Sequence, residues 1–173
     1  HLFLQCGVGG FASAGVAYAF WRSGRWNEVI ESWTKSNLLS EELRNELLKN
    51  TTTTTTTNND NIWSPDLRII CVEPTDADCI FEAAKMWLRK DEISLRKNNS
   101  LREDNLVQCL GKTESIMAGL NCGYASKTAW PILRDIVDAY CAIGDSYAKD
   151  AVRKLKGLEG VVSGESGAAG IAG

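Results

Sequence analysis

The sequence predicts an α/β protein with a mostly parallel sheet flanked by helices. Two apolar runs, residues 1–6 and 67–72, are too continuous for a one-sided sheet and are typical of buried parallel strands. Each run is followed by turn residues and then by a segment with helical periodicity. Because ligands gather at the carboxyl ends of parallel strands, the loops after these strands are the first candidates for a functional site.

Length and composition limit the function classes. The 173 residues are 44% hydrophobic and 24% charged, which is enough for one buried core. With 19 basic and 22 acidic residues there is no basic excess for a phosphate backbone, so no nucleic-acid partner is expected. The one histidine is His1, which leaves little material for histidine triads or zinc sites. The chain opens without Met in an apolar run, and we expect a fragment of a longer protein.

The first segment predicts a strand, a glycine turn and a helix. Residues 2–21 carry no charge, but four glycines and the lack of a basic start argue against a membrane span or signal peptide. We therefore expect a strand over residues 1–6, a turn over 7–10 and a small-residue helix over 11–21. No membrane association is expected.

Two polar segments are interpreted as insertions into one α/β domain that spans the chain. Residues 22–62 contain an amphipathic helix opened by Ser40, followed by a Thr/Asn tract that is too polar to order itself. Residues 89–105 carry charges of both signs, as expected for a solvated loop.

The remaining elements follow from helical periodicity and stop signals. Helices are predicted over residues 76–88, 114–120 and 128–142. A further helix is expected to begin with Asp145 as its N-cap and to stop at Gly157. A short strand over residues 161–162 would then lead into a second glycine-rich loop.

The first glycine loop is the strongest candidate for a ligand site. Gly7, Gly9 and Gly10 follow a strand and open a helix, so backbone N–H groups and the helix dipole can converge on a phosphate. With Ala12 the spacing also satisfies a dinucleotide fingerprint, for which Glu73 would supply the ribose-binding acid. A tight turn without any ligand is the third alternative.

The second glycine loop offers polar side chains at another predicted strand end. Ser163, Glu165 and Ser166 supply a hydroxyl, a carboxylate and a second hydroxyl, which could hydrogen-bond a heteroaromatic nitrogen there. The structural alternative is that Ser163 is the N-cap of a following helix.

Four segments together resemble the diaminopropionate ammonia-lyases. They are residues 4–10 (LQCGVGG), 72–79 (VEPTDADC), 115–123 (SIMAGLNCG) and 163–168 (SGESGA). That family belongs to the fold type II enzymes of pyridoxal 5'-phosphate (PLP), with threonine deaminase, serine racemase and cysteine synthase. The resemblance covers nearly everything outside the two polar segments.

The resemblance implies PLP as cofactor and a set of residues that bind it. These are Gly7, Val8, Gly9 and Gly10 at the phosphate, Met117, Ala118 and Gly119 near the ring, and Ser163 or Glu165 at the pyridine nitrogen. A hydroxyl partner would leave that nitrogen largely unprotonated, whereas a carboxylate would favour the pyridinium form.

The resemblance also bears on metal binding and on two cysteines. Glu73 and the backbone of Ala77 match cation positions of serine-racemase-like relatives, but the third position is Cys79. Because hard cations prefer oxygen, no metal site is predicted, and Glu73 is expected to cap the following helix or to pair locally. Cys79 and Cys122 match cysteines of the family; a bridge between them is one alternative, and reduced thiols are favoured in the cytoplasm.

The implied reaction is the conversion of 2,3-diaminopropionate into pyruvate and two ammonia molecules by a cytoplasmic homodimer. The resemblance puts the lysine that binds the cofactor and the general base before residue 1. No catalytic residue is therefore predicted within these residues, and the fragment alone is expected to be inactive. The alternatives are a serine/threonine dehydratase, a dinucleotide-binding oxidoreductase domain and a catalytically inactive scaffold.

Overall fold

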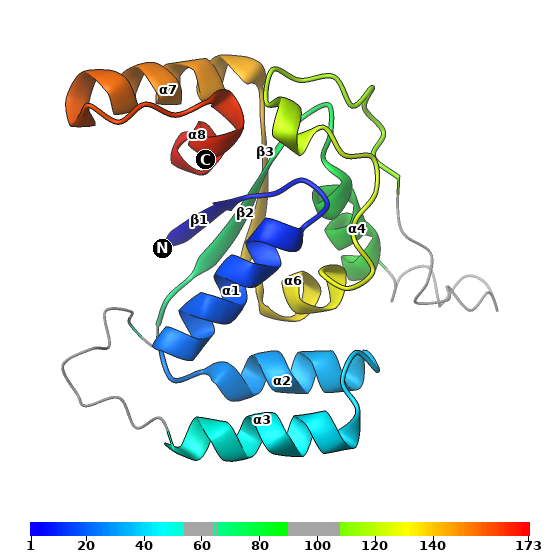
Figure 1. Cartoon of the computed structure of the whole chain (residues 1–173). Coiled ribbons are helices and arrows are strands. Elements are labelled where there is room, and N and C mark those ends of the chain that lie inside the picture. Colours follow the sequence, from blue (N-terminus) through cyan, green and yellow to red (C-terminus); the bar gives the residue numbers. More distant parts are fainter. Residues whose placement is uncertain (54–63, 65, 90–107) are drawn as a thin grey trace.

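Three parallel strands form the centre of the chain. The structure is a computed structural model, and it describes residues 1–53, 64, 66–89 and 108–173. In these residues β1 (Leu2–Gln5), β2 (Ile69–Pro74) and β3 (Ala139–Ile143) pair in the order β1-β2-β3 (Figure 1). Both pairings are parallel, so the three strands end at the same edge of the sheet. The predicted fold class is confirmed.

Alternate residues of β2 face two separate cores. Ile69 and Cys71 are fully buried in one hydrophobic cluster, whereas Val72 is fully buried in another, against which Ile70 packs. A strand that is buried on both faces needs an uninterrupted apolar sequence. This is the physical reason for the continuous run that predicted β2.

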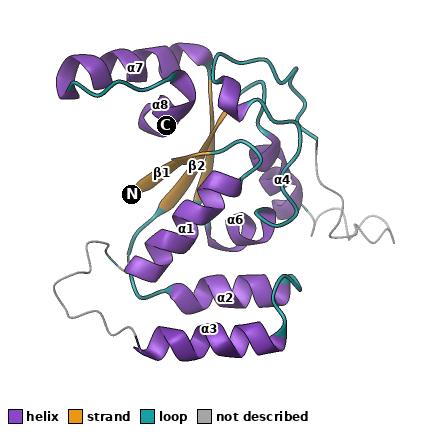
Figure 2. Cartoon of the chain, in the orientation of Figure 1, coloured by secondary structure: helices purple, strands orange, loops and turns teal. Residues whose placement is uncertain are grey.

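Helices cover both faces of the sheet (Figure 2). The first core is covered by α1 (Gly10–Arg22), α4 (Cys79–Leu88) and α6 (Trp130–Ile136). The second is covered by α7 (Asp145–Glu159), α8 (Glu165–Ala172) and the short 3₁₀ helix η1 (Ala118–Leu120). A further layer, α2 (Trp26–Lys35) and α3 (Glu41–Thr53), lies against α1 and α6 through α2 (Figure 1).

The uncharged N-terminal segment folds as predicted, into β1, a glycine turn and α1. α1 packs its small residues, including Ala12 and Ala19, into the first core without exposed area. None of the helices in the described ranges is long and apolar enough to cross a membrane.

The helix predicted over residues 128–142 is wrong in its second half. α6 ends at Ile136, and Ala139–Ile143 is the strand β3. The Asp138 carboxylate accepts a hydrogen bond from the Ile69 N–H (2.8 Å), and Cys141 lies opposite Val72 in the sheet. Pairing with β2, which is distant in sequence, overrides the helical spacing of this segment.

Four other predictions about these elements are also wrong. Of the helix predicted over residues 114–120 only η1 forms, and residues 161–162 are irregular rather than a strand. α7 passes Gly157 and ends at Gly160, whose φ of 66° suits glycine in a helix C-cap. Gly144 is the N-cap and Asp145 is the first helical residue, and the Asp145 carboxylate accepts the Ser115 hydroxyl (2.6 Å).

The two segments interpreted as insertions are described only in part. Residues 54–63 and 90–107 lie outside the described residues, so this interpretation stays a prediction, as does the disorder of the Thr/Asn tract. The Ser40 hydroxyl accepts the Leu43 N–H (3.2 Å) at the start of α3, as the sequence predicts. α2 was not predicted, yet its Val29 and Ile30 are fully buried.

A buried serine joins α2 to α6, and its removal should destabilise the protein. The Ser32 hydroxyl contacts the Pro131 carbonyl (3.1 Å) and the Asp135 carboxylate (2.9 Å). We expect Ser32→Ala to lower the free energy of unfolding by about 1 kcal/mol, measured by urea titration. Ser36→Ala is the matched control, because the buried Ser36 hydroxyl has no hydrogen-bond partner among the described residues. Equal losses for the two variants would contradict this role for Ser32.

Candidate functional site

The glycine loop between β1 and α1 has its carbonyl groups tied to the protein. The Gly7 carbonyl accepts the Cys79 thiol (Sγ to O, 3.4 Å), the Val8 carbonyl accepts the Ser126 N–H (2.7 Å), and the Gly9 carbonyl accepts the Ser13 N–H (2.8 Å). In a planar trans peptide the carbonyl and the next N–H point in opposite directions. Each of the three peptide groups therefore points its N–H, which belongs to Val8, Gly9 or Gly10, away from the donor that holds its carbonyl.

The N-terminus of α1 adds further donors to this loop. The first N–H groups of a helix have no partner inside the helix, and the dipole makes this end positive. Gly9 is the N-cap, and no side-chain cap is formed at this helix end. The loop is thus suited to an anion such as a phosphate group.

Two glycines of the loop are required by its geometry. Gly9 has a φ of 99°, and a Cβ placed on it would lie 2.8 Å from a methyl carbon of Leu133. A Cβ on Gly7 would lie 3.0 Å from the Cys122 sulfur. A Cβ on Gly10 would meet nothing within 4 Å.

A cavity of about 290 Å³ lies beside the loop, at the carboxyl edge of the sheet. Its lining comes from three segments: Gln5, Gly7, Val8, Gly9, Gly10 and Phe11, then Gly119, Leu120 and Cys122, then Ser166 and Gly167. Residues from the first turns of α1 and of α8 both belong to this set. Two helix N-termini therefore converge on one cavity, which again favours an anionic ligand.

The residues predicted to bind a cofactor are only partly brought together. Gly7, Val8, Gly9, Gly10 and Gly119 line the cavity.

Met117 is fully buried in the second core, while Ala118 is exposed and is not part of the lining. Ser163 and Glu165 are also outside the lining, and the Ser163 hydroxyl donates to the Gly164 carbonyl (3.0 Å). Their contact with a pyridine ring stays a prediction.

Ser166 was expected only as the second hydroxyl of the loop, and its contact was not predicted from the sequence. Its hydroxyl accepts the Gly119 N–H (3.0 Å) and so joins α8 to η1 at the cavity. Ser163 is not the N-cap of α8, because Gly164 holds that position and Ser166 falls in the first turn. The motif itself contained both serines, but only the start of the helix decides which one reaches the cavity.

Glu73 caps α4, which is one of the roles predicted for it. It is 1% exposed, and its two carboxylate oxygens accept the N–H groups of Ile80 (2.9 Å) and Phe81 (2.7 Å). Burial raises the pKa of Glu73 to about 8, against the lowering effect of these two N–H groups. A carboxylate used in this way is not available to a ribose hydroxyl, so the dinucleotide alternative loses its acid.

The six cysteines are free thiols in the structure. Cys79, at the start of α4, is fully buried, and burial raises the pKa of its thiol above the ordinary value. Cys122 lies next to Gly7 and lines the cavity. Within the described ranges no group of three or more metal-binding side chains occurs.

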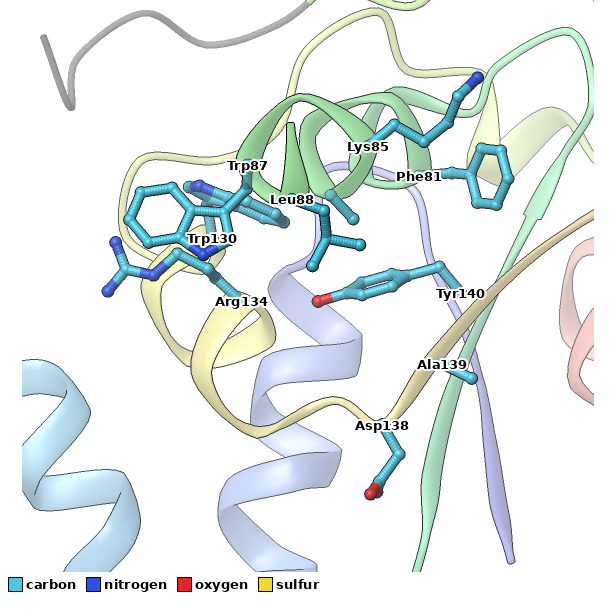
Figure 3. A pocket seen from close by; sticks show the side chains of 10 residues that line it. Phe81, Lys85, Trp87, Leu88, Trp130, Arg134, Asp138, Ala139 and Tyr140 are labelled. Carbon is cyan, nitrogen blue, oxygen red and sulfur yellow. The ribbon is translucent and has the colours of Figure 1, made fainter. Parts of the chain in front are cut away.

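A second cavity of the same volume has different chemistry (Figure 3). It lies where β3 begins, and it is lined by the rings of Phe81, Trp87, Trp130 and Tyr140. Its cations have partners of their own, since Lys85 pairs with Glu82, and the Arg134 guanidinium pairs with Asp135 and stacks on Trp87 (4.5 Å). Its lining is mainly aromatic and includes Trp87 and Leu88 at the C-terminal end of α4, so it is less suited to a phosphate.

The fold and the glycine loop define a class: α/β proteins that bind an anionic group where a strand of a parallel sheet leads into a helix. The chain belongs to the pyridoxal-phosphate dependent enzyme family, whose sequence profile matches residues 48–173. This confirms the cofactor class that the resemblance implied.

The chain is similar to diaminopropionate ammonia-lyases of two bacteria. It is 32% identical to that of Escherichia coli (strain K12) over 116 residues, which is 64% of this chain and 25% of the relative. It is 27% identical to that of Salmonella typhimurium over 177 aligned residues, which is 99% of this chain and 30% of the relative. The chain thus spans between a quarter and a third of the length of these relatives.

Among solved structures the chain is similar to a threonine deaminase from T.th. The TM-score is 0.50 at 19% identity, over 63% of this chain and 33% of the other. This likeness supports the fold class.

The residues at the glycine loop fit the phosphate of PLP. The donors are the aimed N–H groups and the α1 N-terminus, which no side chain caps. Gly10 carries no side chain, and a Cβ placed on it would meet no atom within 4 Å. The space next to Gly10 is therefore open to an anion.

Alanine substitutions at the adjacent residues Gly9 and Gly10 should have different effects on stability. Gly9→Ala forces a positive φ on alanine and a contact of 2.8 Å with Leu133, so we expect it to lower the free energy of unfolding by about 1–3 kcal/mol. Gly10→Ala lies in α1 and meets open space, so we expect a change within about 0.5 kcal/mol. Urea titration of the complete apo protein measures both. A loss at Gly10 as large as that at Gly9 would contradict this account of the loop.

Burial of Glu73 predicts a pH dependence of stability. The pKa rises from 4.5 to about 8, so protonation favours the folded state. The stability contributed by this group is fully present below pH 4.5, falls as the pH rises toward 8, and is lost above it.

Glu73→Gln, which mimics the neutral acid, should remove this part of the slope. Urea titrations between about pH 5 and 8 should show the wild type losing stability relative to the variant as the pH rises. Parallel curves would show that Glu73 titrates with an ordinary pKa.

Proposed function

We propose that this chain is part of a PLP-dependent ammonia-lyase that converts 2,3-diaminopropionate and water into pyruvate and two molecules of ammonia. The observation that carries the cofactor part is the glycine loop, whose carbonyls are tied back and whose helix N-terminus has no side-chain cap. The substrate part is supported by the two bacterial diaminopropionate ammonia-lyases that the chain resembles.

In this proposal the chain holds the cofactor. Val8, Gly9 and Gly10 donate backbone N–H groups to the phosphate, and the positive end of α1 stabilises its charge. Gly119, fixed to Ser166, closes the other side of the cavity. When bound, PLP supplies an electron sink for the carbanion that forms when the substrate loses its Cα proton.

The groups that move protons are proposed to come from outside this chain. The cavity lining in the described residues contains no lysine and no carboxylate. The lysine that binds the cofactor and the general base are therefore expected from the rest of the protein. The homodimer implied by the resemblance also stays a prediction, and sedimentation velocity of the complete protein tests it.

A serine/threonine dehydratase is the nearest alternative, because only the leaving group differs. In both reactions the Cα proton is removed and the group on Cβ departs, as ammonia in one case and water in the other. The residues of this chain hold the cofactor in either reaction, so they do not distinguish the two substrates.

The test is release of pyruvate, or of 2-oxobutyrate from threonine, by the complete protein reconstituted with PLP. D- and L-diaminopropionate, serine and threonine are offered in parallel, and a lactate-dehydrogenase coupled assay follows the product. We expect turnover of diaminopropionate to exceed that of serine and threonine by at least about 100-fold in kcat/KM, a difference of roughly 2.7 kcal/mol in transition-state stabilisation. Faster turnover of serine or threonine would establish the dehydratase instead. Bound PLP without any turnover would favour an inactive scaffold.

A further inference from the structure

One of the three anchors of the glycine loop is a side chain. The Val8 and Gly9 carbonyls are held by backbone N–H groups, whereas the Gly7 carbonyl is held by the thiol of Cys79. The thiol comes from α4, which is distant along the chain. The direction of the Val8 N–H thus depends on the position of α4 through the Gly7–Val8 peptide plane.

The position of the thiol is itself fixed by Glu73. Cys79 is the first residue of α4, and the Glu73 carboxylate holds the next two N–H groups, those of Ile80 and Phe81. A carboxylate oxygen of Glu73 also lies 3.7 Å from the Cys79 sulfur. Both residues are almost fully buried, so water does not compete for these contacts.

We propose that Glu73 and Cys79 are a pair of positioning residues that set the affinity of the glycine loop for the cofactor phosphate. The proposal deepens the proposed function and rests on its cofactor part, namely that this loop binds PLP. Glu73 fixes the start of α4, and Cys79 transmits that position to the Gly7 carbonyl. Neither side chain contacts the cofactor.

Two features favour this role over plain core packing. The thiol is held protonated by burial and so keeps its one S–H, and the Gly7 carbonyl (3.4 Å) is nearer to the sulfur than the Glu73 oxygen (3.7 Å). Glu73 is one of only two polar or charged side chains that are buried in the described residues. Burying a carboxyl group costs free energy, and an apolar side chain of similar volume would fill the same space without that cost.

The test compares two probes that differ only in the phosphate. The dissociation constants of PLP and of pyridoxal are measured by fluorescence titration of the complete apo protein. A positioning role predicts that Cys79→Ala lowers the preference for PLP over pyridoxal by about 3- to 10-fold, the range of one lost hydrogen bond. Inorganic phosphate, used as a competitor of PLP, should weaken by a similar factor. Cys79→Ser restores a donor and should recover at least half of the loss.

Cys109→Ala is the matched control. Its thiol is also buried in the first core and also donates to a glycine carbonyl, but to that of Gly111 (3.8 Å) instead of one in the glycine loop. We expect this variant to lose stability without a change in the preference for PLP.

Each outcome has a distinct meaning. If Cys79→Ala weakens PLP and pyridoxal equally, or acts no differently from Cys109→Ala, the positioning role is overturned and the thiol is only structural. If the wild type shows no preference for PLP over pyridoxal, the loop does not bind the phosphate and the inference fails with it. If the preference behaves as expected but diaminopropionate is not turned over, the proposed reaction fails while the inference stands.

Discussion

The planarity of the peptide bond is the constraint on which the candidate site depends. A glycine loop is conformationally free by nature, and its N–H groups face a common ligand only when something fixes each peptide plane. Here three carbonyls are fixed, at Gly7, Val8 and Gly9, by donors from α4, from the segment before α6 and from α1. The anchors belong to the scaffold, so the donors are oriented before any ligand arrives. Such preorganisation is what separates a binding loop from a flexible turn.

The parallel sheet is what allows these anchors to meet. Because β1, β2 and β3 run in the same direction, the glycine loop, the Glu73 segment and the start of α7 all emerge at one edge. The two cores then fix the layers above and below that edge. Met117 and Leu120 pack into the second core, which brings Gly119 to Ser166 on α8. The cavity is therefore a consequence of packing on both faces, and neither face alone would enclose it.

The sequence predicts those parts of the molecule that depend on local pattern. β1, β2 and the glycine loop follow from apolar runs and glycine spacing, and the capping role of Glu73 agrees with its place near the end of a strand that leads toward a helix. β3 was predicted as helix because its residues satisfy a helical spacing, and only pairing with β2 makes them a strand. The position of Ser166 at the cavity was not predicted, for a related reason. The start of α8 decides which serine faces the cavity, and one residue of error rotates a helix by about 100°.

The N-termini of α4 and α1 lie at the same edge of the sheet and differ in whether a side chain of the protein accepts their N–H groups. α4 points two N–H groups of its first turn at the carboxyl oxygens of Glu73, a group that belongs to the protein, so these donors need no external partner. α1 begins with no side-chain cap, and the carbonyls of Gly7, Val8 and Gly9 at its start accept hydrogen bonds from other donors. The N-terminus of α4 is therefore capped by a side chain of the protein, whereas that of α1 is not. An anion from outside the chain is the natural partner of the N–H groups at the start of α1.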